Sequence, residues 1–206
     1  MRRSRLIGIA VTCSALLMVS CGSAGQSANA DETVSSDEPG VVLVDLDDAS
    51  EVARWTTVND PVMGGKSTSS VAFGDGGLVF SGTLSLANNG GFASARGPQN
   101  PDIGRKAAGA KSLRVRAVGD GKTYLLKVGT AGQPWSYIHR FQTVPGVEQT
   151  YDLPTEGFRP VGQRLDPAPD APQTLDPSGI TQAAVYILDK QQGPFRIAIS
   201  AISAVK

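Results

Sequence analysis

The chain has 206 residues, with 19 basic and 19 acidic side chains, one histidine and two cysteines. This length suits one domain with a sizeable core. No basic cluster lies in the body of the chain, which excludes nucleic acid as an expected partner. One histidine, without zinc-type cysteine spacing or a phosphate-binding loop, also argues against most catalytic and cofactor-dependent classes, so we expect no cofactor and no metal.

The first twenty residues have the pattern of a secretory signal peptide. The basic stretch "MRRSR" precedes "LIGIAVTCSALLMV", an apolar run that is short for a transmembrane span. The following "LLMVSCGS" resembles the bacterial lipoprotein signal, although Met18 stands where leucine is usual. We therefore expect residues 1–20 to be removed, and acyl chains such as palmitate on Cys21 to anchor the mature protein to the lipid bilayer.

This processing predicts an exported protein without a disulfide. Cys13 would leave with the signal and Cys21 would carry lipid, so no cysteine pair remains. Removing Arg2, Arg3 and Arg5 leaves 19 − 3 = 16 basic against 19 acidic residues, a net charge of −3. The expected location is the outer face of the cytoplasmic membrane, or the outer membrane in a Gram-negative cell.

Beyond the signal, composition separates a tether from a folded domain. Residues 21–40 contain almost no large apolar side chain and are expected to form a flexible tether. In residues 41–206, short runs such as "VVLVDL", "GLVFSGTLSL", "SLRVRAV", "TYLLKVG", "SYIHRFQTV", "QTYDL", "AAVYILD" and "FRIAISAI" recur between turn signals, several with a period of two. The pattern predicts an all-β fold, an antiparallel β-sandwich or jelly roll.

Two segments interrupt this pattern. "DLDDASEVARW" favours at most a short helix capped by an aspartate. "RPVGQRLDPAPDAPQTLDPSG" contains five prolines and predicts a long surface loop between late strands, a candidate for part of a binding rim.

The stretch "WTTVNDPVMGGKST" is the first candidate binding motif. Asn59 and Asp60 favour a turn, and the pair Gly64 and Gly65 permits backbone conformations closed to other residues. A turn does not explain the apolar Met63 among them, nor Trp55 on the apparent strand before them. These positions could therefore shape a corner or contact a ligand.

A second motif, "LSLANNGGFASARG", also combines asparagines with a glycine pair. Asn88, Asn89, Gly90 and Gly91 are typical of a hairpin turn, after which Phe92 begins another strand. The two glycine pairs permit close approach of the backbone, either to each other or to a ligand. Asn88 and Asn89 join Asn59 and Asp60 as candidate polar contacts.

The aromatic segment "WSYIHRF" is the third candidate. Strand alternation places Trp135, Tyr137 and His139 on one face. Three interpretations remain open: a half-buried surface strand, an aromatic platform for a sugar or peptide, and a metal or catalytic histidine.

Taken in order, the motifs "WTTVNDPVMGGKSTS", "LVFSGTLSLANNGGFASARG", "VGDGKTYLLKV", "YDLPTEGFRPV" and "YILDKQQGPFRIAISAI" resemble the complex I intermediate-associated protein family. The resemblance spans Trp55 to about Ile202. The positions that match the family pattern are Trp55, Asn59, Asp60, Met63, Gly64, Gly65, Asn89, Gly90, Gly91, Phe92, Gly193, Pro194 and Phe195.

The resemblance implies a galactose-binding-domain-like β-sandwich and no established catalytic residues. The family is named for a mitochondrial assembly factor of the respiratory NADH:ubiquinone oxidoreductase. An exported lipoprotein would lie on the wrong side of the membrane for that role, so the resemblance transfers the fold better than the function.

The leading hypothesis for function is a membrane-anchored, non-catalytic binding or assembly module of the cell envelope. It would recognise a glycan or a protein partner through loops at one end of the sandwich. An alternative is an enzyme acting on envelope polysaccharide through paired carboxylates. The carboxylates proposed for it are Asp60, Asp120 and Asp189. A third possibility is a calcium ion bound by Asp45, Asp47 or Asp48, against the simpler interpretation of a solvated acidic turn.

Overall fold

The computed structural model describes residues 40–206, without the side chain of Met63. The predicted signal peptide, Cys21 and all but the end of the predicted tether lie outside the described residues. None of the described helices is long and apolar enough to cross a membrane.

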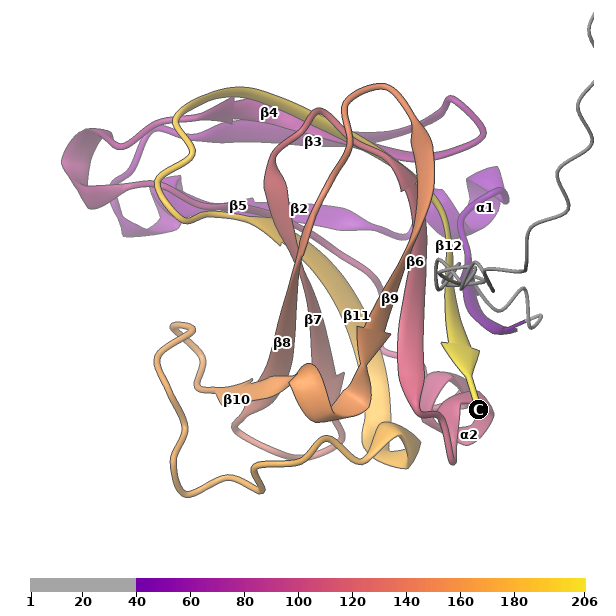
Figure 1. Ribbon diagram of the computed structural model, residues 1–206. Coiled ribbons are helices and arrows are strands. Elements are labelled where there is room, and N and C mark those ends of the chain that lie inside the picture. Colours follow the sequence, from indigo (N-terminus) through magenta and orange to yellow (C-terminus); the bar gives the residue numbers. More distant parts are fainter. Residues whose placement is uncertain (1–39) are drawn as a thin grey trace, which may run out of the picture. The chain divides into compact units, whose positions relative to one another are not determined.

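Two antiparallel sheets form the sandwich (Figure 1). In the first, the strand order is β3 (Thr68–Gly74), β4 (Gly77–Leu84), β12 (Gly193–Val205), β6 (Ser112–Val118) and β9 (Glu148–Pro154), and β1 (Val41–Asp45) also pairs with β12. In the second, the order is β10 (Arg159–Val161), β8 (Ser136–Gln142), β7 (Thr123–Thr130), β11 (Ile180–Ile187), β5 (Ala93–Arg96) and β2 (Thr56–Asn59). The predicted antiparallel β-sandwich is confirmed.

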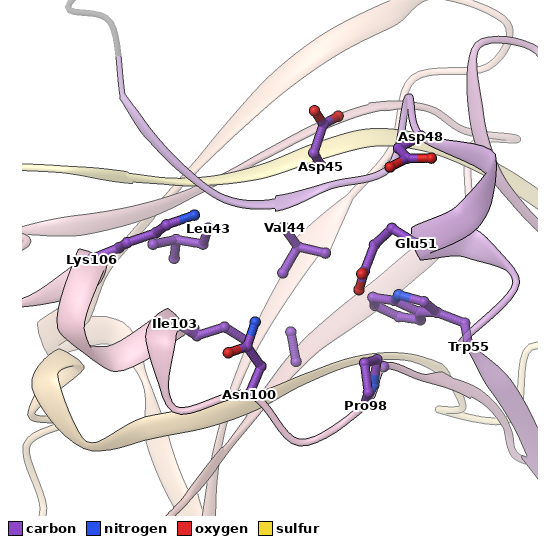
Figure 2. A pocket seen from close by; sticks show the side chains of 12 residues that line it. Leu43, Val44, Asp45, Asp48, Glu51, Trp55, Pro98, Asn100, Ile103 and Lys106 are labelled. Carbon is purple, nitrogen blue, oxygen red and sulfur yellow. The ribbon is translucent and has the colours of Figure 1, made fainter.

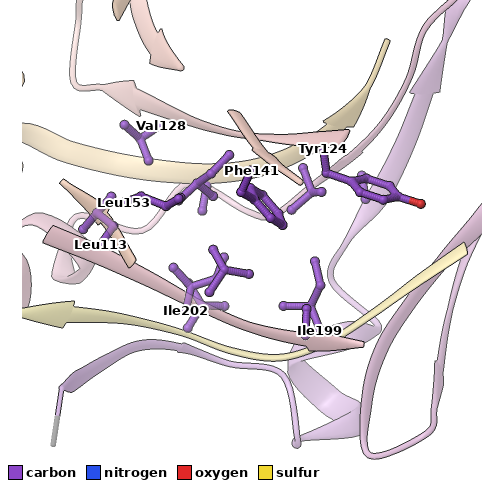
Figure 3. Packing of buried hydrophobic residues seen from close by; sticks show 14 of the residues in the cluster. Leu113, Tyr124, Val128, Phe141, Leu153, Ile199 and Ile202 are labelled. Atoms are coloured by element: carbon purple, nitrogen blue, oxygen red, sulfur yellow. The ribbon is translucent and has the colours of Figure 1, made fainter. Parts of the chain in front are cut away.

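Strand alternation builds the core between the sheets. On β7, Tyr124, Leu126 and Val128 point inward, and on β6 Leu113 does the same, each at most 1% exposed. Figure 3 shows Leu113, Tyr124 and Val128 packed among Phe141, Leu153, Ile199 and Ile202. On β12 a register shift between Ile199 and Ala201 changes the phase of alternation, so Ile199 and Ile202 both face inward.

The second sheet is apolar on both faces. On the face opposite the core, Leu125, Ile138, Val161, Ala184 and Tyr186 form a separate cluster, none more than 7% exposed. A sheet face is buried only when something covers it, and here Leu165 of the proline-rich loop packs against the cluster.

The helices are short. Helix α1 (Ala49–Val52) begins where expected, and Asp48 caps it by accepting a hydrogen bond from the Ser50 amide at 2.8 Å. Helix α2 (Asp102–Ala107) was not predicted, and it packs against the turn Pro177–Gly179. Gly104 permits that approach, because a Cβ there would lie 2.2 Å from the Ser178 carbonyl oxygen.

The expectation of a hairpin at Asn88–Gly91 is wrong. This segment joins β4 of the first sheet to β5 of the second, so it crosses between layers. Asn88, Asn89 and Gly91 have the positive φ angles that the motif predicts, 56°, 57° and 127°. The local turn chemistry is therefore present, whereas the pairing of the flanking strands is set by the sheets.

Truncating a side chain of this core should measurably lower the free energy of unfolding. Replacement Leu113→Ala removes a fully buried side chain from between the sheets and should lower the free energy of unfolding by about 2–5 kcal/mol. The control Val147→Ala, at a side chain that is 47% exposed, should change it by less than about 0.5 kcal/mol. Urea unfolding followed by fluorescence measures both, and equal effects would contradict this core.

Candidate binding groove

The outer face of the second sheet forms the floor of a groove. Strand register aligns its side chains in two transverse rows. One row contains Val58, Ser94, Tyr186, Leu125 and Arg140, and the other contains Thr56, Arg96, Ala184, Lys127, Ile138 and Arg159. Cations therefore lie among apolar residues on a face that is otherwise largely covered.

The proline-rich loop divides the space above this floor. Leu165 borders two hollows, one of about 580 Å³ and one of about 490 Å³. The larger is lined by Val58, Val62, Asn89–Phe92, Arg96, Gln163–Leu165, Tyr186 and Leu188–Lys190. Leu165 has φ 62°, a left-handed conformation that is uncommon for leucine. The loop that was predicted as a candidate binding rim thus borders both hollows.

Two cations share one aromatic ring in this floor. The Arg96 guanidinium carbon lies 5.4 Å from the centroid of the Tyr186 ring, and the Lys127 ammonium lies 5.5 Å from it. Both distances are within the range of cation–π attraction. Burial, and then the charge of Arg96, lower the pKa of Lys127, while burial raises the pKa of Tyr186.

The carboxylate in the larger hollow is already paired. Asp189 accepts hydrogen bonds from Arg140 Nε and Nη2 at 2.8 and 3.0 Å, and this pairing raises the pKa of Arg140. Arg96 donates to the Ser94 hydroxyl at 3.1 Å. Among the described residues, neither Arg96 nor Lys127 forms an ion pair with a carboxylate.

One buried carboxylate joins the two glycine-rich motifs. Asp60 is 1% exposed; its Oδ1 accepts from the Ser67 amide at 2.8 Å, and its Oδ2 accepts from the Ser67 hydroxyl. The same Oδ2 accepts from the amides of Gly91 at 2.6 Å and Phe92 at 3.3 Å. Burial acts to raise the pKa of Asp60, but these hydrogen bonds outweigh it and lower the pKa.

The glycine pairs are explained by this carboxylate. A Cβ at Gly65 would lie 2.4 Å from the carboxyl carbon of Asp60, and one at Gly90 would lie 2.7 Å from its Oδ2. Gly64 has φ 90° and ends the turn Asp60–Met63. The two motifs thus approach each other through backbone, as the sequence allowed, and Asp60 is a structural group that does not face a ligand.

The remaining residues of these motifs divide between structural roles and the groove. Asn88 donates to the Gly64 carbonyl at 3.1 Å, and the Asn59 amide group lies 2.6 Å from the Ser69 hydroxyl. Asn89 is exposed and lines the larger hollow together with Phe92. Met63 closes its turn, and its side chain lies outside the described part. Asn89 is thus the predicted polar contact that the structure brings to the groove.

The segment "WSYIHRF" does not form an exposed aromatic platform, which was one of its three interpretations. Tyr137 is 3% exposed and donates its hydroxyl to the Pro172 carbonyl at 3.0 Å. The His139 ring packs edge-on against Phe158, with centroids 5.1 Å apart. Trp135 is half-buried against the core and borders, with Tyr137, a small hollow of about 240 Å³. Alternation was correct, but this face of β8 is the one directed to the core.

Trp55 lines a separate hollow of about 200 Å³ (Figure 2). The indole is 4% exposed, and its Nε1 has no hydrogen-bond partner among the described residues. Figure 2 shows Trp55 and Glu51 at one side of this hollow and Lys106 at the other. Glu51 is already paired with Arg54 at 2.8 Å.

The carboxylates proposed for catalysis have structural partners. Asp120 accepts from the Lys122 amide, the Tyr124 hydroxyl and the Arg196 amide at 3.0, 3.1 and 2.9 Å. Asp60 and Asp189 are engaged as described above. Within residues 40–206, no group of three or more His, Cys, Asp or Glu side chains is arranged to hold a metal ion.

A family profile matches most of the described chain. The profile of Complex I intermediate-associated protein 30 (CIA30) matches residues 44–199. The chain belongs to this family. The match includes both glycine-rich motifs, so the Asp60 carboxylate and the Gly91 amide that donates to it both lie within the family domain. A search of the curated proteins found no match to this chain.

Solved structures share its fold at low identity. The family 11 carbohydrate-binding module of the cellulosomal cellulase Lic26A-Cel5E of Clostridium thermocellum matches with a TM-score of 0.56 and 15% identity, covering 78% of this chain and 92% of the module. The same family 11 module in complex with a β-1,3-1,4-mixed-linked tetrasaccharide gives 0.52 and 13%, covering 78% and 94%. An agarase, AgWH50C, gives 0.51 and 12%, covering 81% of this chain and 26% of the enzyme.

Sequence reasoning about this CIA30 member missed the groove floor. The signal was present in "TYLLKVG" and "AAVYILD", where apolar residues occupy consecutive positions and both strand faces are therefore buried. Within the run "TYLLKVG", Lys127 is the charged residue. Within the run "AAVYILD", Tyr186 is the residue that carries a polar hydroxyl on an apolar ring. Arg96 carried no such signal, because it ends its strand.

The role assigned to Asp60 predicts a pH-dependent stability. Its pKa is lowered in the folded state, so its contribution is complete above the unfolded value of about 3.9 and is lost as pH falls through the lower, folded pKa. Asp60→Asn should lower the free energy of unfolding at pH 7 by at least about 2 kcal/mol. The reason is that the Asn NH2 group would replace a carboxylate oxygen and would then face the N–H and O–H groups that donate to that oxygen. This difference should shrink in urea titrations at progressively lower pH. The exposed control Asp47→Asn should show neither effect, and a pH-independent loss in Asp60→Asn would refute the assignment.

Proposed function

We propose that this protein is a non-catalytic binding module that takes a glycan in the groove over the second sheet. The observation that carries the proposal is the groove itself, a strand-floored hollow of about 580 Å³ that meets a second of about 490 Å³ at Leu165. Each volume lies in the range of small-molecule sites, about 300–1,000 Å³. Two adjoining hollows suit an extended ligand better than a compact one.

The lining supports binding without chemistry. It combines hydrogen-bonding groups from Asn89, Gln163 and Arg164 with apolar surface from Val58 and Phe92. Glycoside hydrolysis needs two carboxyl groups facing each other across the substrate. Among the described lining residues of both hollows, Asp189 is the sole carboxylate, and it is held by Arg140.

The structural neighbours add support at the level of the fold. The family 11 module has the same sandwich, and one of its structures holds a mixed-linked tetrasaccharide. Fold likeness at 13% identity does not transfer the ligand, so the argument for a glycan rests on the shape and lining of this groove together with that precedent.

The proposal includes a membrane anchor outside the cytoplasm. The lipoprotein-like "LLMVSCGS" and the polar stretch from Gly22 to Gly40 support it. Such an anchor and tether would hold the domain near envelope polysaccharide while leaving the groove free to reorient.

Glycan binding can be tested by blocking the groove. Val58 lines the groove from the edge strand β2, so Val58→Trp should weaken binding to a glycan on an envelope-polysaccharide array by at least about tenfold, through steric exclusion. The matched control Ala72→Trp adds the same bulk at an exposed position of β3, the edge strand of the other sheet, and should bind normally. Both variants must melt cooperatively, and equal binding by the two would place the site elsewhere.

The anchor can be tested separately in cells. The intact protein should incorporate labelled palmitate and partition with membranes, whereas Cys21→Ala should lose the label and become soluble. Cys13→Ala serves as the matched control and should behave as the parent. Label retained in Cys21→Ala would exclude lipidation at this residue.

A further inference from the structure

We propose that the ligand of this groove is an acidic glycan, and that Arg96 and Lys127 together bind its carboxylate or sulfate group. The inference rests on the proposed glycan-binding function and names the ligand class of the same site. Its basis is a pair of neighbouring cations that no carboxylate of the described chain neutralises.

The register of the sheet creates this pair. Arg96 on β5 and Lys127 on β7 both lie directly across from Ala184 on β11. The small Ala184 side chain leaves room between them, and both cations reach the ring of Tyr186, two residues further along β11 on the same face. Three consecutive strands of the sheet thus converge on one positively charged spot. Arg96 lines the larger hollow there, and Lys127, which is not among the lining residues of either hollow, lies beside it on the Tyr186 ring.

The pair lacks the carboxylate partner that most of the described arginines have. Six arginines, namely Arg54, Arg105, Arg114, Arg116, Arg140 and Arg196, each form an ion pair with a carboxylate. Arg96 has the neutral Ser94 hydroxyl and the Tyr186 ring, and Lys127 has that ring. Two like charges held close together in a half-buried place repel each other, and burial adds a desolvation cost. An anionic ligand would offset both.

The same floor is poorly suited to an uncharged sugar. Neutral sugar rings pack their C–H faces on exposed aromatic rings, but the Tyr186 ring is 3% exposed beneath its two cations. Phe92 supplies a half-buried ring at the groove end. Charge-assisted hydrogen bonds from the cations are therefore the strongest interaction that this floor offers.

The rim has the same sign. Arg164 and Lys190 line the larger hollow, and Arg140 and Arg159 line the smaller one. Arg140 is neutralised by Asp189, which leaves an excess of positive charge along the groove although the mature chain is expected to be acidic overall. Such local contrast attracts an anionic ligand to the groove and away from the rest of the surface.

Two matched probe pairs test the inference, using the chain from Gly22 to Lys206 in calorimetric titrations. Oligogalacturonate is compared with its neutral methyl ester, and a sulfated carrageenan oligosaccharide with a neutral agarose oligosaccharide. Arg96→Gln combined with Lys127→Gln removes the cation pair. Arg105→Gln combined with Lys111→Gln removes the same charge from exposed positions outside the groove.

We expect one acidic probe to bind at least about tenfold more tightly than its neutral counterpart, with an affinity that falls as salt rises. The groove double variant should lose this preference and its salt dependence, while its melting temperature stays level or rises as repulsion is relieved. The control double variant should keep both. The preferred probe pair tells carboxylate from sulfate recognition.

The contrary outcomes separate the two proposals. Equal binding of acidic and neutral probes, abolished by Val58→Trp, would overturn the acidic preference and leave glycan binding in this groove standing. Acidic preference that survives in the groove double variant would overturn the role of Arg96 and Lys127. Absence of binding to every probe and to the wider glycan array would overturn both proposals.

Discussion

The carboxylate of Asp60 is the interaction on which the candidate site depends. It accepts hydrogen bonds from the amides of Ser67, seven residues further along the chain, and of Gly91, 31 residues further along. An anionic acceptor surrounded by backbone donors is stable when buried, because the charge is satisfied locally. Through Gly91 and Phe92 the same contact sets the course of the chain from one sheet into the other, and that crossing forms the end wall of the groove. The polar residues of the first motif thus support the candidate groove, while Val58 and Val62 of the same motif line it.

The second sheet carries the opposite arrangement, in which apolar residues support charged ones. Leu165 packs against the apolar cluster that contains Leu125 and Ala184, and Arg96 and Lys127 are half-buried on the same sheet face. Cations in such a place interact more strongly with a ligand than cations in water, since the local dielectric is lower.

Membership of the complex I intermediate-associated protein 30 family and likeness to carbohydrate-binding modules agree on the sandwich. They differ in what their names suggest, assembly of a protein complex in one case and sugar recognition in the other. Groove shape, and the engagement of the described carboxylates by backbone and arginine, favour recognition over catalysis. Charge on the groove floor then distinguishes this chain from a module that binds by aromatic stacking alone.

The sequence by itself determined the all-β class, most of the strands between Val41 and Val205, an aspartate cap on the first helix and the proline-rich loop, because alternation and turn chemistry act over a few residues. It did not predict β3, and it placed β10 within the loop. The family resemblance was equally readable from motifs in order. Which face of a strand meets the core was not readable, since Trp135, Tyr137 and His139 alternate identically whichever way β8 turns. Nor did any local pattern bring Arg96, Lys127 and Tyr186 together, because they lie on three strands whose order in the sheet differs from their order in the chain. Those decisions belong to the tertiary structure, where register and burial are set by the packing of the whole sandwich.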